Sequence, residues 1–171
     1  MKETKGDKTM KGDKTMTPAT VLDLVNVFFA GMLAGSEFVI HYGVRAPAEA
    51  LDDQAQLRLR QALVLRLRVL VPAFFAPTAL LGIGLTVLNR AAPGFGLRCA
   101  GVAAILAWVG IRVVGTVPIN SATVAWEPSA PPADWKAQVA HAERFHSVGV
   151  WAAALSFASF LGAAALRLAA R

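Results

Sequence analysis

Four long apolar segments alternate with shorter polar connections along the chain. They cover approximately residues 19–42, 69–88, 97–117 and 145–169. A transmembrane helix needs about 20 mostly apolar residues, and each segment is close to that length. The pattern therefore predicts an all-α integral membrane protein in which residues 17–171 form a single four-helix bundle.

The second helix is expected to be much longer than its apolar segment. Its polar first turns begin at Asp52 and contain four arginines, namely Arg58, Arg60, Arg66 and Arg68. A helix over residues 53–89 would measure about 55 Å, which exceeds the thickness of a bilayer core. Either its first turns project from the membrane, or Pro72 and Pro77 bend it.

The other helices have recognisable ends. Thr17 and Pro18 are typical of a helix start, with Thr17 as the cap. Pro47 should interrupt the chain after the first helix, and Pro118 should bend or end the third. The proline-rich stretch 126–132 cannot form a regular helix, so the fourth helix should begin after it.

Residues 1–16 differ from the rest of the chain. The sequence Lys-Gly-Asp-Lys-Thr-Met occurs twice there, at 5–10 and 11–16. The stretch is polar and has no apolar periodicity, which predicts a disordered N-terminal tail. It is either native or an upstream artefact, with translation then starting at Met10 or Met16. We assign it no function.

Composition supports a membrane protein. Hydrophobic residues make up 56% of the 171 and charged residues only 16%, whereas soluble domains carry about 25% charged residues. The net charge of +6 does not indicate nucleic acid, because the cations are scattered along segment edges. Membrane lipids are the expected partners of the edge arginines Arg90, Arg98, Arg167 and Arg171.

The single Cys99 excludes an internal disulfide. The Gly- and Ala-rich helix faces leave homo-oligomerisation open.

The three histidines, His41, His141 and His146, lie near one edge of the predicted bundle. The first ends the first apolar segment and the other two open the fourth, so helices that cross in alternating directions bring them into one leaflet. Two carboxylates accompany them at helical spacing, as Glu37–His41 and Glu143–His146. Ionisable groups at this depth are costly and usually functional. We therefore expect a polar site at this edge.

Histidine and carboxylate at helical spacing are how helical bundles build metal sites, as in the di-iron bundles that use Glu-x-x-His. We predict that Glu37, His41, Glu143 and His146 bind a transition metal. Imidazole and carboxylate ligands suit iron, copper or zinc; iron is favoured, and copper is the alternative.

Other polar groups converge on the same leaflet. Asn120 ends the third helix, and the second helix supplies Arg60, Arg66 or Arg68, of which we take Arg60. A purely structural interpretation stays open, in which Glu37 pairs with an arginine of the second helix and both charges are neutralised. The roles of His141, and of Arg112 deep in the third apolar segment, are also open.

The third helix ends with Val117-Pro118-Ile119-Asn120, a proline-rich loop with a tryptophan follows, and His146 opens an alanine-rich last helix. In these features, over most of residues 19–168, the sequence resembles a family of small four-helix membrane proteins. That family, long classed as a domain of unknown function, includes the anthrone oxygenases of aromatic polyketide pathways. The resemblance implies a membrane oxygenase or oxidase that turns a lipophilic aromatic such as an anthrone into a quinone, with Asn120 and His146 at its site. The chain departs from many members at Ala142 and Gly149, where they carry tryptophan and arginine.

Two functions are therefore expected. The favoured one is a membrane-embedded, metal-dependent oxidoreductase that uses molecular oxygen on a lipophilic, phenol- or anthrone-like aromatic. In it, Asn120 and Arg60 orient the substrate or bound oxygen, and the apolar bundle keeps water away. The alternative is a non-enzymatic carrier or accessory subunit in which Glu37, Arg112 and His146 handle protons or a solute. Either protein would lie in a bacterial-type inner or plasma membrane.

Overall fold

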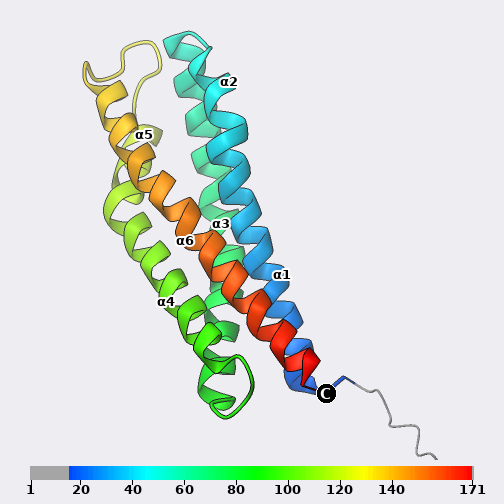
Figure 1. Cartoon of the computed structure of the whole chain (residues 1–171). Coiled ribbons are helices and arrows are strands. Elements are labelled where there is room, and N and C mark those ends of the chain that lie inside the picture. Colours follow the sequence, from blue (N-terminus) through cyan, green and yellow to red (C-terminus); the bar gives the residue numbers. More distant parts are fainter. Residues whose placement is uncertain (1–15, 171) are drawn as a thin grey trace, which may run out of the picture.

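The computed structural model describes residues 16–170, which fold almost entirely into helices (Figure 1). The first rod consists of α1 (Pro18–Phe38), the π-helical segment η1 (Val39–Val44) and α2 (Arg45–Glu49). The second rod is α3 (Asp53–Leu88). The third consists of α4 (Phe95–Ile111), the π-helical segment η2 (Arg112–Thr116) and α5 (Val117–Val124), and the fourth is α6 (Trp135–Ala169). The predicted N-terminal tail lies, apart from Met16, outside the described residues.

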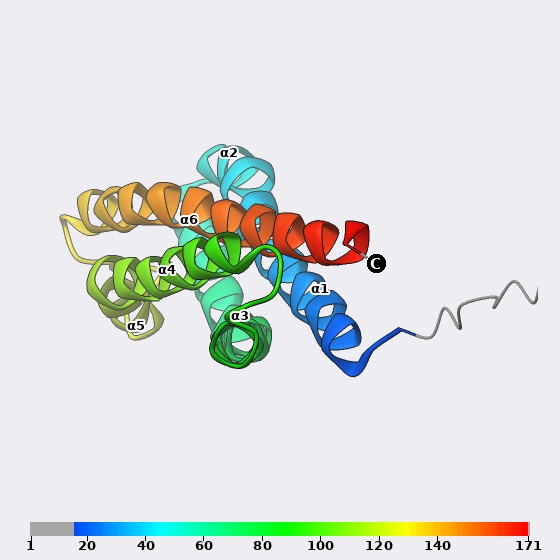
Figure 2. The same cartoon turned by 60° about the horizontal axis from the view of Figure 1, so that its bottom comes forward.

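The four rods run alternately up and down, and each is long and apolar enough to cross a membrane. This confirms the predicted four-helix bundle. α6 packs on α1 and on α4, and α3 packs on the same two helices (Figure 2). The end of the first rod and the start of α6 lie at one end of the bundle, together with α5 and the beginning of α3 (Figure 1). The predicted site depends on this arrangement.

Local sequence explains where the rods begin. The Thr17 side chain accepts a hydrogen bond from a backbone N–H of the first turn of α1, and Pro18 occupies the first helical position. Asp52 caps α3 in the same way, with an N–H···O distance of 2.9 Å. Gly94 precedes α4 with φ at 82°, and a Cβ there would come 2.8 Å from the Ala163 Cα. Both the backbone conformation and the close approach require glycine.

The predicted interruption at Pro47 does not occur, and of the two predicted effects of Pro118 the end of the helix does not occur. Pro47 lies within α2 and Pro118 within α5, so the first and third rods continue past both prolines. Each proline follows shortly after a π-helical segment. A proline lacks a backbone N–H, and its ring strikes the carbonyl four residues earlier in a regular α-helix. The wider π turn moves that carbonyl aside, which allows the rod to continue.

α3 is the long helix that the sequence predicts. It runs without interruption through Pro72 and Pro77. Its 36 residues extend over about 54 Å, far more than the roughly 30 Å of a bilayer core. This length favours the alternative in which the arginine-rich first turns project from the hydrocarbon, which stays a prediction.

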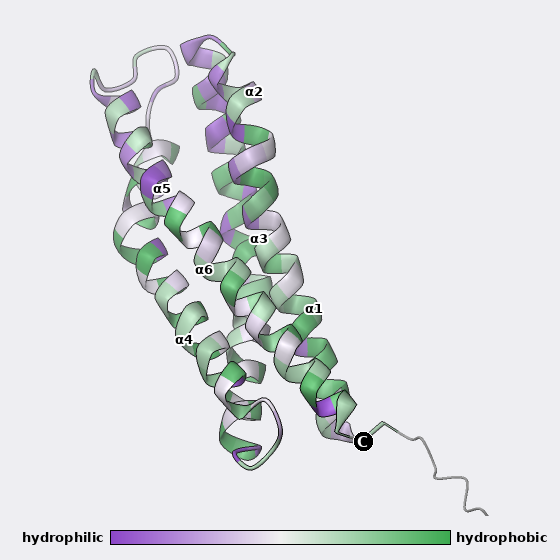
Figure 3. Ribbon diagram, viewed as in Figure 1, coloured by the Kyte–Doolittle hydropathy of each residue, from purple (hydrophilic) through white to green (hydrophobic). Residues whose placement is uncertain are grey.

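The bundle is apolar both inside and outside. Leu33, Ile105 and Ala153 belong to the buried core, whereas Leu80 and Val114 are 72% and 74% exposed. Hydrophobic residues cover most of the length of the rods, and hydrophilic ones gather mainly at the end that carries α2 and α5 (Figure 3). Apolar surface of this extent is stable in contact with lipid rather than water. The chain is an integral membrane protein.

Candidate functional site

Two π-helical segments border the predicted site. η1 carries His41, and η2 carries Arg112 and Thr116. A π turn is wider than an α turn, changes the direction of the side chains that follow, and is frequent at functional sites. Each segment is followed by a proline, Pro47 or Pro118, at which the rod continues.

His41, Glu143 and His146 form a group that can hold a metal ion. One ligand atom from each lies within 4.8 Å of those of the other two, and the two imidazole centroids are 5.4 Å apart. His41 Nδ1 is buried and has no hydrogen-bond partner in the described part of the chain. Two imidazoles and one carboxylate are the ligand set of many non-haem iron sites. Metal–ligand bonds of about 2.1 Å require only a small closure of this group.

Glu37, the fourth predicted ligand, lies behind this group and not within it. Its side chain is 0% exposed. One carboxylate oxygen accepts a hydrogen bond from Arg112, and the other lies 3.1 Å from His146 Nε2. A carboxylate beside the remote nitrogen of a ligand histidine fixes the orientation of the ring. The partner of Glu37 is thus the deep arginine of the third rod, not an arginine of α3 as the structural interpretation had it.

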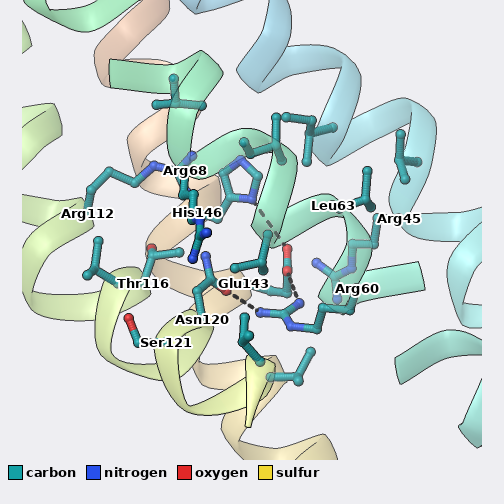
Figure 4. A pocket seen from close by; sticks show the side chains of 18 of the residues that line it. Arg45, Arg60, Leu63, Arg68, Arg112, Thr116, Asn120, Ser121, Glu143 and His146 are labelled. Atoms are coloured by element: carbon teal, nitrogen blue, oxygen red, sulfur yellow. Dashed lines mark hydrogen bonds and ion pairs between the residues drawn. The ribbon is translucent and has the colours of Figure 1, made fainter. Parts of the chain in front are cut away.

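Arg60 and Asn120, predicted to act on the substrate, meet beside the same group. Arg60 Nη1 donates a hydrogen bond to Glu143 Oε1 at 3.0 Å, and its Nη2 donates to Asn120 Oδ1 at 2.9 Å. Arg60 thereby joins α3, α5 and α6 (Figure 4). Because the amide oxygen of Asn120 accepts from Arg60, the amide NH₂ is left to donate to another partner. All four rods contribute to the site.

His141 does not join this group. It is exposed, and its ring packs against Phe145 with centroids 5.1 Å apart. Five positions separate it from His146 on α6, so the two side chains leave the helix on different faces. His141 therefore provides a matched control for substitutions of the grouped histidines.

A cavity of about 600 Å³ adjoins the group. Its polar end is formed by Arg60, Asn120, Glu143 and His146, which converge in Figure 4. The walls are mainly apolar and include Leu63, Leu67, Val71, Phe75, Val113 and Val117. Small-molecule sites typically have volumes of roughly 300–1,000 Å³, with a few polar groups among apolar walls. This cavity has those properties.

A second buried charge cluster, not expected from the sequence, lies at the other end of the bundle. Arg98, only 1% exposed, donates from Nε and Nη2 to the two carboxylate oxygens of Asp23, at 3.3 and 3.0 Å. Arg167 Nε lies 2.9 Å from Asp23 Oδ2. Arg98 and Arg167 thus turn inward, whereas their position at segment edges predicted contact with lipid head groups. An arginine buried among apolar helices needs a counter-ion, and Asp23 supplies it.

A spacing in the sequence marks both clusters. Asp23 and Glu37 lie 14 positions apart, and so do Arg98 and Arg112. Because α1 and α4 run in the same direction, equal spacings produce two acid–arginine pairs in register, about 21 Å apart along the helices. This repeated spacing was the signal that could have identified the partner of Glu37.

Comparison with known proteins adds no relative. No family model matches the chain, and no curated protein or solved structure matches it either. The resemblance to the anthrone oxygenases therefore stays a prediction that rests on the residues around Asn120 and His146.

Proposed function

We propose that the protein is a membrane-embedded, metal-dependent oxygenase or oxidase of lipophilic aromatic compounds. One observation carries the proposal: a two-histidine, one-carboxylate group adjoins a cavity of about 600 Å³ with mainly apolar walls. Such a cavity has room for a molecule of three fused rings. The ligand set suits iron first and copper second.

The simplest reaction of this class needs no external reductant. An anthrone carries a ring CH₂ group between two aromatic rings. One atom of molecular oxygen becomes the new carbonyl oxygen at that carbon, and the other leaves as water with the two methylene hydrogens. The aromatic substrate supplies all the electrons that reduce the oxygen, so the product is a quinone and water.

In this proposal His41, Glu143 and His146 hold the metal ion, and Glu37 keeps the imidazole of His146 in position. A bound iron ion supplies activation of molecular oxygen, which reacts slowly with organic molecules on its own. Arg60 fixes the carboxylate of Glu143 through the hydrogen bond described above. It also fixes the Asn120 amide, whose NH₂ group is then oriented to donate to an oxygen atom of the substrate.

The membrane supplies the substrate in this account. The cavity has exposed side chains on two sides. On α3 these are Arg68 and Pro72, and on the third rod they are Val113 and Val117. The cavity thus opens between these two rods, within segments that cross the bilayer. A lipophilic aromatic dissolved in the membrane can enter from the side, while the apolar walls exclude water from the reacting groups. We assign the protein to a bacterial-type inner or plasma membrane, since bacterial outer membranes hold β-barrels rather than apolar helical bundles.

The carrier alternative has weaker support. A proton or solute path would have to connect the Glu37 cluster with the Asp23 cluster at the other end. Between them the core contains the apolar Leu33, Ile105 and Ala153, and the buried polar side chains of this stretch, Asn26, Thr78, Ser156 and Ser159, carry no charge.

Metal analysis of the purified protein tests the proposal. The wild-type chain and His141→Ala should bind iron in near-stoichiometric amounts, and His41→Ala should lose it. The iron-loaded wild type and the iron-loaded His141→Ala variant should both consume oxygen when anthrone is added. Sub-stoichiometric metal in the wild type, or equal metal in His41→Ala and His141→Ala, would contradict the proposal.

A further inference from the structure

Four arginines line the cavity, and they differ in their partners. Arg45, Arg60 and Arg112 each form an ion pair with a glutamate. Arg68 also lines the cavity, but it has no ion pair or hydrogen bond with any residue in the range 16–170. One positive charge at the cavity is therefore left without a protein counter-ion.

Two further polar groups on residues that line the cavity have no partner within residues 16–170, but their atoms are closed off from its interior. Trp108 Nε1 is buried and has no partner among the described residues, and an indole nitrogen can only donate. Thr116 Oγ1 is likewise buried without a partner, and a hydroxyl can donate or accept. By contrast, the carboxylates that line the cavity, Glu49 and Glu143, already accept from arginines. The carboxylates that line the cavity are thus already engaged, and Arg68 is the charged group that is left for a ligand.

The position of Arg68 suits the charged end of an amphiphilic molecule. Arg68 immediately precedes the apolar stretch 69–88, which is about 30 Å long and fills the bilayer core. Its guanidinium therefore lies near the boundary between hydrocarbon and head groups. Further along the same wall come Val71 and Phe75, and the Phe75 ring lies 5.2 Å from that of Trp108. Aromatic rings at this position favour a flat apolar ligand body.

From these features we propose that the cavity binds a lipophilic aromatic that carries an anionic oxygen, a carboxylate or a phenolate, with Arg68 as its counter-ion. Arg68 is then a residue that determines substrate specificity. The inference rests on the proposed function only in taking the bound molecule to be the substrate. Charge balance supports it: the carboxylates that line the cavity are already paired with arginines, so Arg68 leaves the cavity with a positive charge that an anionic ligand offsets.

Two matched probes test this inference without any metal. The chelator-treated protein is placed in phosphatidylcholine nanodiscs and titrated with an anthracene carboxylate, and separately with the carboxamide that has its substituent at the same ring position. Probe fluorescence anisotropy reports binding, and nanodiscs without protein give the background. The pH is chosen so that the carboxylate is ionised. The wild type should bind the carboxylate about tenfold more tightly than the carboxamide, as expected for a charge-assisted hydrogen bond.

Variants assign that preference to one side chain. Arg68→Gln should weaken carboxylate binding by about tenfold and carboxamide binding by less than about twofold. Arg68→Lys keeps the charge and should retain part of the preference. Arg66→Gln removes the same charge from the same helix at a residue that does not line the cavity, and it should bind both probes like the wild type. Circular dichroism of each variant checks that the helices are intact.

Three results would overturn the inference. The first is a wild-type protein that binds both probes equally. The second is an equal loss of carboxylate binding in Arg68→Gln and Arg66→Gln, which would indicate a general effect of surface charge. The third is that Arg68→Gln binds the carboxylate as tightly as the wild type does. If this variant also loses the phosphatidylglycerol that co-purifies with the wild type, Arg68 binds a lipid head group instead. These titrations use metal-free protein, so a negative binding result does not contradict the proposed metal centre. Equally, a negative metal analysis does not contradict a positive binding result.

Discussion

Replacement of Glu37 by glutamine separates the metal ligands from the residues that support them. Glu37→Gln keeps the shape of the side chain and an oxygen for Arg112, but it removes the negative charge 3.1 Å from His146 Nε2. Charge-assisted hydrogen bonds are about twice as strong as neutral ones, and loss of a carboxylate behind a ligand histidine lowers metal affinity about 10- to 100-fold. Because Arg112 already shares this carboxylate, we expect a loss of metal affinity at the lower end of this range. A tenfold loss corresponds to about 1.4 kcal/mol.

The assay is an anaerobic competition titration of iron(II) against a coloured chelator, with the protein in detergent. Glu37→Gln should bind as many ions as the wild type but less tightly, whereas His146→Ala should bind none. Arg112→Gln is the control, because it leaves the carboxylate beside His146 in place; it should lower stability but not metal affinity. Loss of bound ions in Glu37→Gln, as in His146→Ala, would make Glu37 a ligand. Unchanged affinity would show that it does not support His146, and either result refutes the reasoning.

Further predictions concern stability and the role of the metal. Asp23→Asn removes the charged carboxylate against which Arg98 is buried and should cost about 3–5 kcal/mol, whereas Glu49→Gln breaks an exposed pair and should cost less than about 1 kcal/mol; equal losses in chemical unfolding would contradict this. A Cβ at Gly115 would lie 2.0 Å from the Phe145 ring, so Gly115→Ala should lose roughly 1–3 kcal/mol together with bound metal. Gly96→Ala, where a Cβ has no neighbour within 4 Å, should lose neither, and similar behaviour of the two variants would be evidence against the packing argument. Removal of the metal by chelation should stop anthrone-dependent oxygen consumption and leave helix content unchanged; full activity of metal-free protein would exclude a metal role.

Hydropathy and end signals were sufficient to predict the fold. Four apolar stretches of spanning length define four rods, and the caps at Thr17 and Asp52 place the starts of two of them. Pro47 and Pro118 were misleading, because their usual effect on an α-helix was applied without considering a π turn. A π turn leaves no mark in the apolar pattern, since it inserts a residue without changing which segment is hydrophobic.

The candidate site was predicted in location but not in detail. Alternating topology alone brings His41 and His146 to one end of the bundle, so their proximity follows from the sequence. The partner of Glu37 does not follow, because it depends on how far each helix is rotated about its own axis. That rotation is set by packing between rods and by the π segments. The same uncertainty explains why Arg98 was expected at the lipid surface when it is buried against Asp23.

The central claim is that His41, Glu143 and His146 hold one metal ion next to the cavity. Anomalous diffraction at the iron absorption edge, from crystals of the iron-loaded protein, tests it most directly. A single strong anomalous peak is expected between these three side chains, with Glu37 outside bonding distance of it. A peak at another place, or no peak in crystals of active protein, would contradict it.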